Sequence, residues 1–362
     1  MRTRRKAVPR LLVMSRAPMH LRPRSTSPTA KALTALGILV LVLGGAGFGA
    51  ALWFQNSLDG NIERIGDPFA GIPGRPAPAP SDPSEPDEAV NILVLGSDSR
   101  ISAGDPSQWE AGAQRTDAIM LVHLPADRQA AQVVSIPRDS WVPIPGHGEA
   151  KINAAFSFGG PSLLIQTVEQ LTGIHVDHFV VTDFTSFGNM TDALGGVQIR
   201  VPQDIGDGKQ VFFTAGIHQM AGEEALKYVR QRHGLVNGDF GRVQRQQNWM
   251  RAMLAKVNNN RNDVGTMTSF LTAVSRSVAA DDGFTITRMR GLYLSARGLA
   301  TNDVTFMTAP DSGTGRSADG QSIVVLDHAR FDPLMASFAA DTATAYVAEH
   351  AADLNVLPAT VR

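Results

Sequence analysis

The sequence predicts an α/β domain that follows one transmembrane helix. From residue 90 onward, short runs of apolar and β-branched residues alternate with longer amphipathic stretches, and no internal repeat divides them. Before them, residues 32–54 form a run of 23 positions without a charge, and about 20 apolar residues in a helix cross a bilayer. These two observations set the fold class and the order of its parts.

The first 54 residues predict a basic cytoplasmic tail, residues 1–31, and a membrane anchor, residues 32–54. Nine basic side chains and no acid occur in the tail, whereas two bases and seven acids follow the apolar run before residue 90. Because positive charge marks the cytoplasmic side of a membrane helix, we expect a single-pass cell-membrane protein with its domain outside. A cleaved signal peptide is the alternative, but its apolar region is usually about 7–15 residues long.

Residues 55–89 predict an extracytoplasmic stalk, because residues 67–89 are rich in proline and acids and cannot build a ladder or a core. The folded domain is expected over residues 90–345, with a C-terminal tail over residues 346–362. Beyond residue 31 the chain has 24 bases against 34 acids, and this excess of negative charge argues against a nucleic-acid-binding domain.

The elements of the domain are predicted from residue type and period. Strands are expected at 90–95, 118–124, 132–136, 195–201, 304–308 and 322–326, and helices at 161–172 and 242–257. In the second helix an apolar stripe is expected to be buried, which leaves the polar stripe for another role. The stripe consists of Val243, Met250, Met253, Leu254 and Val257.

Charged residues recur at the ends of the first three predicted strands, where open α/β sheets bind ligands. They are Asp98, Arg100, Arg115, Asp117, Arg138 and Asp139. Asp98 and Asp117 supply the two carboxylates that Mg²⁺ usually takes from a protein when it also binds phosphate oxygens. Salt bridges from these acids to the neighbouring arginines are an equally good explanation.

A second cluster places four arginines within sixteen residues, Arg230, Arg232, Arg242 and Arg245. If the chain leaves a helix extended at Val229, Arg230 and Arg232 point to the same side. Arg242 and Gln246 share a helix face at an N-terminus, which also favours an anion. Converging guanidinium groups suit a pyrophosphate. Neutralisation by Glu223, Glu224 and Asp239 is the structural alternative.

These segments together resemble the LytR-CpsA-Psr family of membrane-anchored cell-wall enzymes. The resemblance covers about residues 90–260 and rests on seven motifs in order. They are Asn91–Arg100, Arg115–Asp117, Ser135–Asp139, Lys151–Ala155 with Gly159 and Gly160, Asp192–Val197, Gly222–Arg232 and Gly238–Gln247. It implies a three-layer α-β-α fold with a central mixed sheet, and a phosphotransferase that moves a glycopolymer from undecaprenyl or decaprenyl pyrophosphate to peptidoglycan as a phosphodiester. The polymer would be arabinogalactan, another wall glycan or a teichoic acid.

The resemblance also implies roles for single residues. Asp98 and Asp117 resemble the family's ligands for Mg²⁺, or Mn²⁺ in its place. Its catalytic and pyrophosphate-binding set is matched by Arg115, Arg138, Arg230, Arg232 and Arg242, with Gln246, and Arg100 is expected nearby. Apolar candidates for the lipid slot are Phe156, Phe179, Phe187 and Leu194, although such residues are commonly core.

Other chemistries have little support. The chain has no cysteine, its histidines show no zinc-binding spacing, and no Gly-x-Ser-x-Gly elbow occurs. Two alternatives remain open: a lipid pyrophosphate phosphatase that uses water as acceptor, and a non-enzymatic envelope regulator that acts as a transcriptional attenuator. The predicted topology argues against the regulator, because only a tail of about thirty residues would face the DNA.

Overall fold

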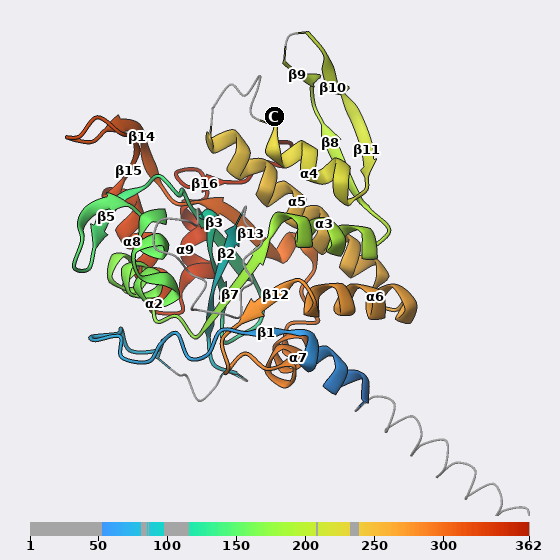
Figure 1. Ribbon diagram of the computed structural model, residues 1–362, viewed down its shortest axis with the longest axis horizontal. Helices are drawn as coiled ribbons and strands as arrows, with labels where there is room; N and C mark the ends of the chain where they lie inside the picture. Colours follow the sequence, from blue (N-terminus) through green and yellow to red (C-terminus); the bar gives the residue numbers. More distant parts are fainter. Residues whose placement is uncertain are drawn as a thin grey trace, which may run out of the picture. The chain divides into compact units, whose positions relative to one another are not determined.

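A mixed sheet of eight strands runs through the chain from residue 55 onward (Figure 1). The computed structural model describes residues 53–80, 85, 87–97, 116–207, 209–231 and 239–361. In spatial order the strands are β1 (Glu63–Arg64), β12 (Val278–Ala280), β7 (His178–Asp183), β2 (Val90–Ser97), β3 (Thr116–Leu124), β4 (Ala131–Ile136), β13 (Val304–Thr308) and β16 (Asn355–Val356). The pairs β1–β12, β7–β2 and β4–β13 are parallel and the other four are antiparallel. The central mixed sheet implied by the resemblance is therefore confirmed.

Helices cover both faces of this sheet, because alternate residues of its strands face opposite layers. The helices are α2 (Asn153–Thr172), α3 (Phe184–Ala193), α4 (Gly222–Arg230), α5 (Asp239–Asn260), α6 (Val264–Ser275), α7 (Ile286–Ser295), α8 (His328–Ala339) and α9 (Ala343–His350), with a short 3₁₀ helix, η2 (Thr301–Asp303). On one face, Leu93 and Leu95 of β2 pack in one core with α2, α8 and α9. On the other face, Val94 packs with Met250 and Leu254 of α5, and α7 covers β7 and β12.

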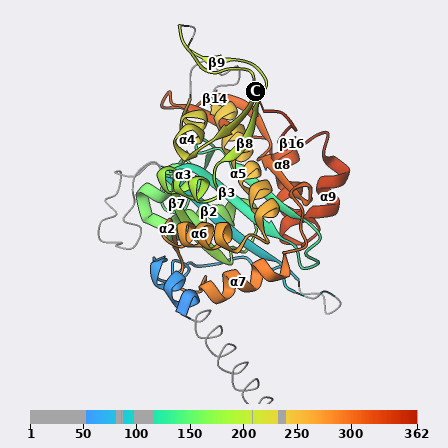
Figure 2. The same cartoon turned by 90° about the vertical axis from the view of Figure 1, so that its right-hand side faces the viewer.

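Four two-stranded ribbons extend from this core. They are β5 (Trp141–Ile144) with β6 (Gly148–Lys151), β8 (Val197–Val201) with β11 (Gly216–Met220), β9 (Ile205–Gly206) with β10 (Val211–Phe213), and β14 (Asp311–Arg316) with β15 (Ser322–Leu326). The β8–β11 ribbon reaches away from the sheet and carries β9 and β10 at its far end (Figures 1 and 2). Its base forms a separate apolar cluster with α3, α4 and α5, centred on Trp249 and Tyr228. This cluster fixes α4 against α5.

The predicted helices and strands are confirmed in position, but the sequence did not predict which strands pair with each other. β13 and β15 have the predicted bounds, yet β15 pairs with β14 outside the main sheet. The helix predicted from Pro161 begins earlier, at Asn153. It is interrupted at Gly159 and Gly160, whose backbone is not helical, and Gly160 has φ of 64°, which favours glycine. The two glycines therefore mark a kink inside α2.

Part of the predicted stalk packs on the domain. Arg75 makes a bidentate pair with Glu169 of α2, with Nε–Oε2 and Nη2–Oε1 distances of 3.0 and 2.7 Å, and it also donates to the Val176 carbonyl. Ile65, which follows β1, is 6% exposed within the α2-side core. The stalk prediction therefore does not describe residues 55–80, because a few anchoring side chains are enough to hold a proline-rich segment that forms little ladder of its own.

The expected C-terminal tail differs in the same way. Within residues 346–362, the second half of α9 and the edge strand β16 belong to the fold, and Val361 is 1% exposed. At the other end of the chain, residues 1–31 of the predicted tail and 32–52 of the predicted anchor lie outside the described residues. Among the helices that the structure does describe, none is long and apolar enough to cross a membrane.

Candidate functional site

One edge of the sheet gathers the strand ends that carry the charged motifs. β2 ends at Ser97, β3 begins at Thr116, and the two residues are Cα partners across the ladder. β4 ends next to them, since Ile136 is opposite Ile119 of β3. The segments that contain Asp98, Arg100 and Arg115 adjoin this edge in sequence, but these three residues lie outside the described residues.

A β-bulge marks the start of β3. Gly96 is opposite Ala118 whereas Ser97 is opposite Thr116, so Asp117 is an extra residue on this strand. Bulges re-aim side chains and occur beside active sites. Thr116 is fully buried and its hydroxyl has no hydrogen-bond partner. Among the described residues, this buried hydroxyl at the bulge is an oxygen atom left available for a ligand.

The metal prediction stays a prediction. The backbone of Asp117 is described but its side chain is not, and the whole of Asp98 is outside the described ranges. Within those ranges, no group of three His, Asp or Glu side chains that could hold a metal ion occurs.

Arg138 is held in a tight turn directly after β4. Ser140 donates its backbone N–H to the Pro137 carbonyl at 2.9 Å, and Asn153, the first residue of α2, donates to the Arg138 carbonyl at 3.2 Å. The Arg138 Nε lies 3.7 Å from Asp139 Oδ2, whose other oxygen lies 3.1 Å from Lys151 Nζ. Asp139 therefore orients the Arg138 guanidinium and is itself occupied by a lysine.

Helix α5 buries its polar side as well as its apolar side. Its N-terminal half places four long polar side chains at 0–7% exposure, those of Arg242, Arg245, Gln246 and Gln247. Long polar side chains are rarely buried so fully unless they bind something. In the predicted apolar stripe, in contrast, Val243 and Met253 are buried and the other three residues are only partly buried.

Gln247 explains how α5 docks on the sheet. Its Nε2 donates to Ser135 Oγ at 2.8 Å and to the Met307 carbonyl at 2.7 Å, which joins the helix to β4 and β13. Arg242 and Gln246 are four residues apart and therefore share one face of the helix. The contact of Gln247 with Ser135 therefore joins this part of α5 to β4, three residues before Arg138.

Arg245 is a site residue to which the sequence assigned no role. It is 2% exposed, its guanidinium carbon lies 5.3 Å from the Tyr228 ring centre, and its Nη1 lies 3.4 Å from the Gln231 carbonyl. Among the described residues its Nε has no hydrogen-bond partner, and burial lowers its pKa. Gln231 separates Arg230 from Arg232, so Arg245 clamps the backbone that carries both arginines.

Helix α4 is held tightly against α3 at its start. A Cβ on Gly222 would lie 2.2 Å from the Gly188 carbonyl oxygen, so only glycine allows the two helices to approach this closely. Asp192 of α3 also accepts the Gly222 backbone N–H at 2.7 Å. The helix continues through Arg230, which is exposed at its last position, so the condition of a chain that is extended from Val229 is not met. Arg232 lies outside the described residues.

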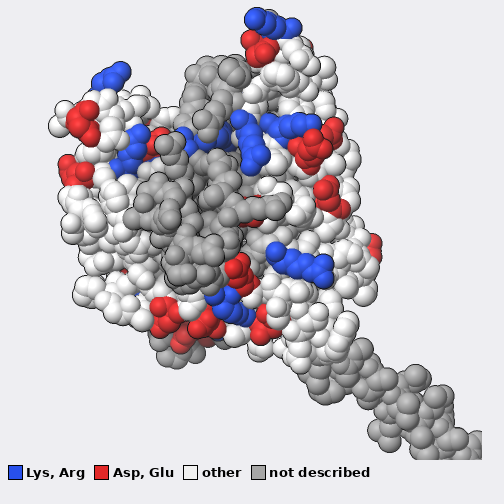
Figure 3. Space-filling model, viewed as in Figure 1, with Lys and Arg blue, Asp and Glu red and all other residues white. Residues whose placement is uncertain are grey.

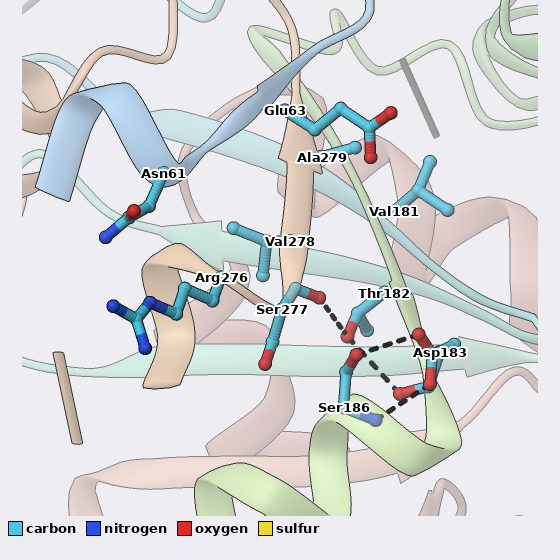
Figure 4. A pocket seen from close by; sticks show the side chains of 10 residues that line it. All are labelled: Asn61, Glu63, Val181, Thr182, Asp183, Ser186, Arg276, Ser277, Val278 and Ala279. Carbon is cyan, nitrogen blue, oxygen red and sulfur yellow. Dashed lines mark hydrogen bonds between the residues drawn. The ribbon is translucent and has the colours of Figure 1, made fainter. Parts of the chain in front are cut away.

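A small polar cavity of about 110 Å³ adjoins the same sheet edge at the end of β7 (Figure 4). Asp183, the Cα partner of Ser97, points into it together with Ser186. Both oxygens of Asp183 are used to cap α3, since Oδ1 accepts the Ser186 N–H at 2.7 Å and Oδ2 accepts its hydroxyl at 2.8 Å. This carboxylate therefore has a structural role at the edge of the site.

The four candidate lipid residues lie in two separate cores. Phe156 and Phe179 are at most 4% exposed in the core on the α2 side, whereas Leu194 and Phe187 belong to the cluster between α3, α4 and α5. They therefore do not line one slot. Another set of partly buried apolar residues lies between the sheet and α5; they are Val94, Val122, Met250 and Leu254.

Four of the predicted phosphate-binding residues are thus described, namely Arg138, Arg230, Arg242 and Gln246. Figure 3 shows lysine and arginine side chains gathered across the upper part of one face, with acidic side chains beside them. The site is not a broad basic surface. The arginines of the site stay a predicted local group, as the charge balance of the sequence favours.

Comparisons with known proteins agree with this arrangement. A model of the LytR_cpsA_psr family matches residues 74–338. Cell wall biosynthesis protein LcpA of Corynebacterium glutamicum is 31% identical over 336 residues, which are 81% of this chain and 62% of LcpA. Regulatory protein MsrR of Staphylococcus aureus is 38% identical over 181 residues, 49% of this chain and 52% of MsrR. The chain therefore spans less than two thirds of either relative.

Solved structures show the same fold. The structure titled "TagT bound to LI-WTA" has 25% identity and a TM-score of 0.56, over 75% of this chain and 98% of that one. TagV of B. subtilis has 25% identity and a TM-score of 0.56, over 70% and 97%. A LytR-Csp2A-Psr enzyme from Actinomyces oris, 22% identical with a TM-score of 0.58 over 77% and 96%, supports the fold alone.

Proposed function

Because this chain belongs to the LytR-CpsA-Psr family, we propose that it attaches a glycopolymer to the cell wall by transferring it from a polyprenyl pyrophosphate to peptidoglycan. The observation that supports the proposal is the burial of Arg242 and Gln246 on α5, a helix that Gln247 joins to Ser135 of β4, the strand that leads to Arg138. The names of two relatives, a cell wall biosynthesis protein and a protein bound to LI-WTA, support the same kind of substrate.

In the proposed reaction, a peptidoglycan sugar hydroxyl attacks the phosphorus that bears the glycan. A new P–O bond forms, the bond to the bridging oxygen breaks, and polyprenyl phosphate leaves with the charge. Such transfers need mainly positioning and charge neutralisation, which Arg138, Arg230 and Arg242 would supply through paired N–H groups. Asp139 already binds Lys151, so we assign it to orienting Arg138 and leave the base for the hydroxyl proton unassigned.

Asp98 and Asp117 would hold a Mg²⁺ ion that neutralises the pyrophosphate oxygens. The prenyl chain would lie against the partly buried apolar residues between the sheet and α5, because α5 also carries Arg242 and these residues have side-chain surface left to cover. We also propose that residues 32–54 anchor the chain in the cell membrane with the domain outside, where peptidoglycan is found.

The test is transfer of a labelled polyprenyl-pyrophosphoryl glycan to peptidoglycan by the full chain in liposomes, with Mg²⁺ and with EDTA. We expect Arg138→Ala, Arg230→Ala and Asp98→Ala each to lower the rate by about 100-fold or more, as loss of one charge-stabilising group typically does. Lys227→Ala is the matched control, since Lys227 is an exposed cation one turn before Arg230 that pairs with Glu223. Wild-type rates in the arginine variants would overturn the proposal.

The same assay separates the two alternatives. A phosphatase would release the label in soluble, phosphate-bearing form without peptidoglycan. A regulator, the role in the name of MsrR, would lose its effect when residues 1–31 are removed and the anchor is exchanged, whereas an extracytoplasmic transferase would keep its activity.

A further inference from the structure

A groove of about 920 Å³ opens beside the arginine site. Its walls come from the turn after β4, the first turns of α5, the β14–β15 ribbon and the edge strand β16. Pro137 and Asp139 flank Arg138 in sequence, and Phe240 and Val243 flank Arg242. The groove therefore begins at the backbone segments that carry two of the proposed phosphate ligands. Its size is at the upper end of the range of about 300–1,000 Å³ for ligand pockets.

The lining of the groove suits hydroxyl groups and does not suit phosphate. No lysine or arginine is among its described lining residues, which include two carboxylates and several amide and hydroxyl groups. Asp311 is partly buried, accepts the Asn355 amide at 3.1 Å and the Gly313 N–H at 2.9 Å, and has its pKa raised by burial. Gln244, Thr314 and Ser322 add donors and acceptors along the walls. Phosphate oxygens would be repelled here, whereas sugar hydroxyls would find partners.

We propose that this groove binds the acceptor, the amino-sugar backbone of a peptidoglycan strand, whose lactyl groups are amidated and therefore uncharged. The inference rests on the proposed function and deepens it. A transferase must hold two substrates, and the donor is already fixed through its pyrophosphate and its lipid. The acceptor has no pyrophosphate, so it needs a separate site of hydroxyl-binding groups that ends where its own hydroxyl meets the phosphorus. This groove meets both conditions.

The arrangement also explains the position of the β14–β15 ribbon. The ribbon lies outside the main sheet and projects beside β5 (Figure 1), and Val324 of β15 donates its backbone N–H to the Asp139 carbonyl at 2.9 Å. That bond ties the outer wall of the groove to the turn that holds Arg138. An acceptor bound along the ribbon is therefore aligned with the arginine site by the protein backbone itself.

The test measures binding of a peptide-free oligosaccharide of N-acetylglucosamine and N-acetylmuramic acid, with its lactyl groups amidated for the same reason, to the full chain by calorimetry. Ser322→Trp and Thr314→Trp place a ring in the groove from facing strands, and Val325→Trp is the control, because Val325 is 42% exposed on β15 and does not line the groove. We expect the first two variants to weaken oligosaccharide binding at least tenfold and to raise the KM for peptidoglycan by the same factor. The KM for the lipid donor should stay within twofold.

Three outcomes separate this inference from the proposed function. Unchanged affinity in both groove variants, with normal unfolding midpoints, overturns the acceptor site even if Arg230→Ala abolishes transfer. A rise in the KM for the donor instead of the acceptor also overturns it, because the groove then holds donor sugars. If Arg230→Ala keeps full transfer while Ser322→Trp weakens oligosaccharide binding, the groove inference stands and the arginine chemistry fails.

Discussion

Replacement of Arg245 by methionine should separate stability from activity. Arg245 is 2% exposed, lies over the Tyr228 ring and reaches the Gln231 carbonyl, while no carboxylate within the described ranges neutralises it. Burying a cation of this kind costs free energy unless a partner neutralises its charge. Arg245 therefore contributes little to the stability of the fold, and we expect its role to be in the arginine site.

The structure gives the size of both effects. Methionine loses a cation–π contact worth about 0.5–2 kcal/mol and one long hydrogen bond of 3.4 Å. It also removes the cost of burying a guanidinium, which is several kcal/mol for an uncompensated ion. We therefore expect the free energy of unfolding to stay within about 1 kcal/mol of wild type or to rise. Transfer should fall about 10- to 100-fold, because a misplacement of about 1 Å near a reacting group has that effect.

The assay combines urea denaturation with initial transfer rates of the full chain. Arg251→Met is the matched control on the same helix, because Arg251 donates to the Pro358 and Ala359 carbonyls and should lose stability with little change in rate per folded molecule. Arg245→Lys keeps the charge without the planar fork and should fall between wild type and Arg245→Met. If Arg245→Met unfolds readily and the remaining folded protein transfers at the wild-type rate, Arg245 is only structural.

Three further predictions concern the fold. Arg75→Ala should lower the free energy of unfolding by about 3–5 kcal/mol in urea, because it leaves the Glu169 carboxylate, 1% exposed, without its partner. Gln247→Leu should cost about 1–3 kcal/mol in the same assay, whereas Gln244→Leu, on a half-buried position of α5, should cost less. Burial raises the pKa of Asp177, so stability should fall as pH rises from the ordinary carboxyl pKa through the raised value; a pH series on Asp177→Asn should lack that slope.

The sequence predicted the parts of the fold that follow from local pattern. Strands such as β13 are recognisable because their apolar residues repeat with the period of a strand. The partner of a strand is a long-range choice, so the separate pairing of β15 with β14 had no local signal. The packing of Arg75 was hidden for the same reason, since its partner Glu169 lies 94 residues away.

In the candidate site, too, the residues with a local sequence signal could be predicted, and those that depend on long-range packing could not. Arg138 could be proposed because a charge at a strand end is visible in sequence, and Arg242 with Gln246 because they share a helix face; their roles stay predictions. The role of Arg245 depends on its burial against Tyr228, and burial of a polar side chain has no periodic signature. The lipid candidates failed to converge because an aromatic residue looks the same in a core as in a slot.

Helix α5 accounts for how one site can serve three chemically different parts of the reaction. At the start of the helix, Phe240 and Gln244 line the polar groove. Arg242 and Gln246 lie in the same two turns and are buried. Farther along, Met250 and Leu254 pack on the apolar face of the sheet. From residue 240 to residue 254 an α-helix rises roughly 20 Å. In the proposed reaction the order along this helix is acceptor sugar, pyrophosphate and lipid, which is the in-line order of the attacking hydroxyl, the phosphorus and the leaving polyprenyl phosphate. A rigid helix that borders all three compartments fixes their spacing, and its attachment to β4 and β13 through Gln247 fixes that spacing relative to the catalytic edge of the sheet.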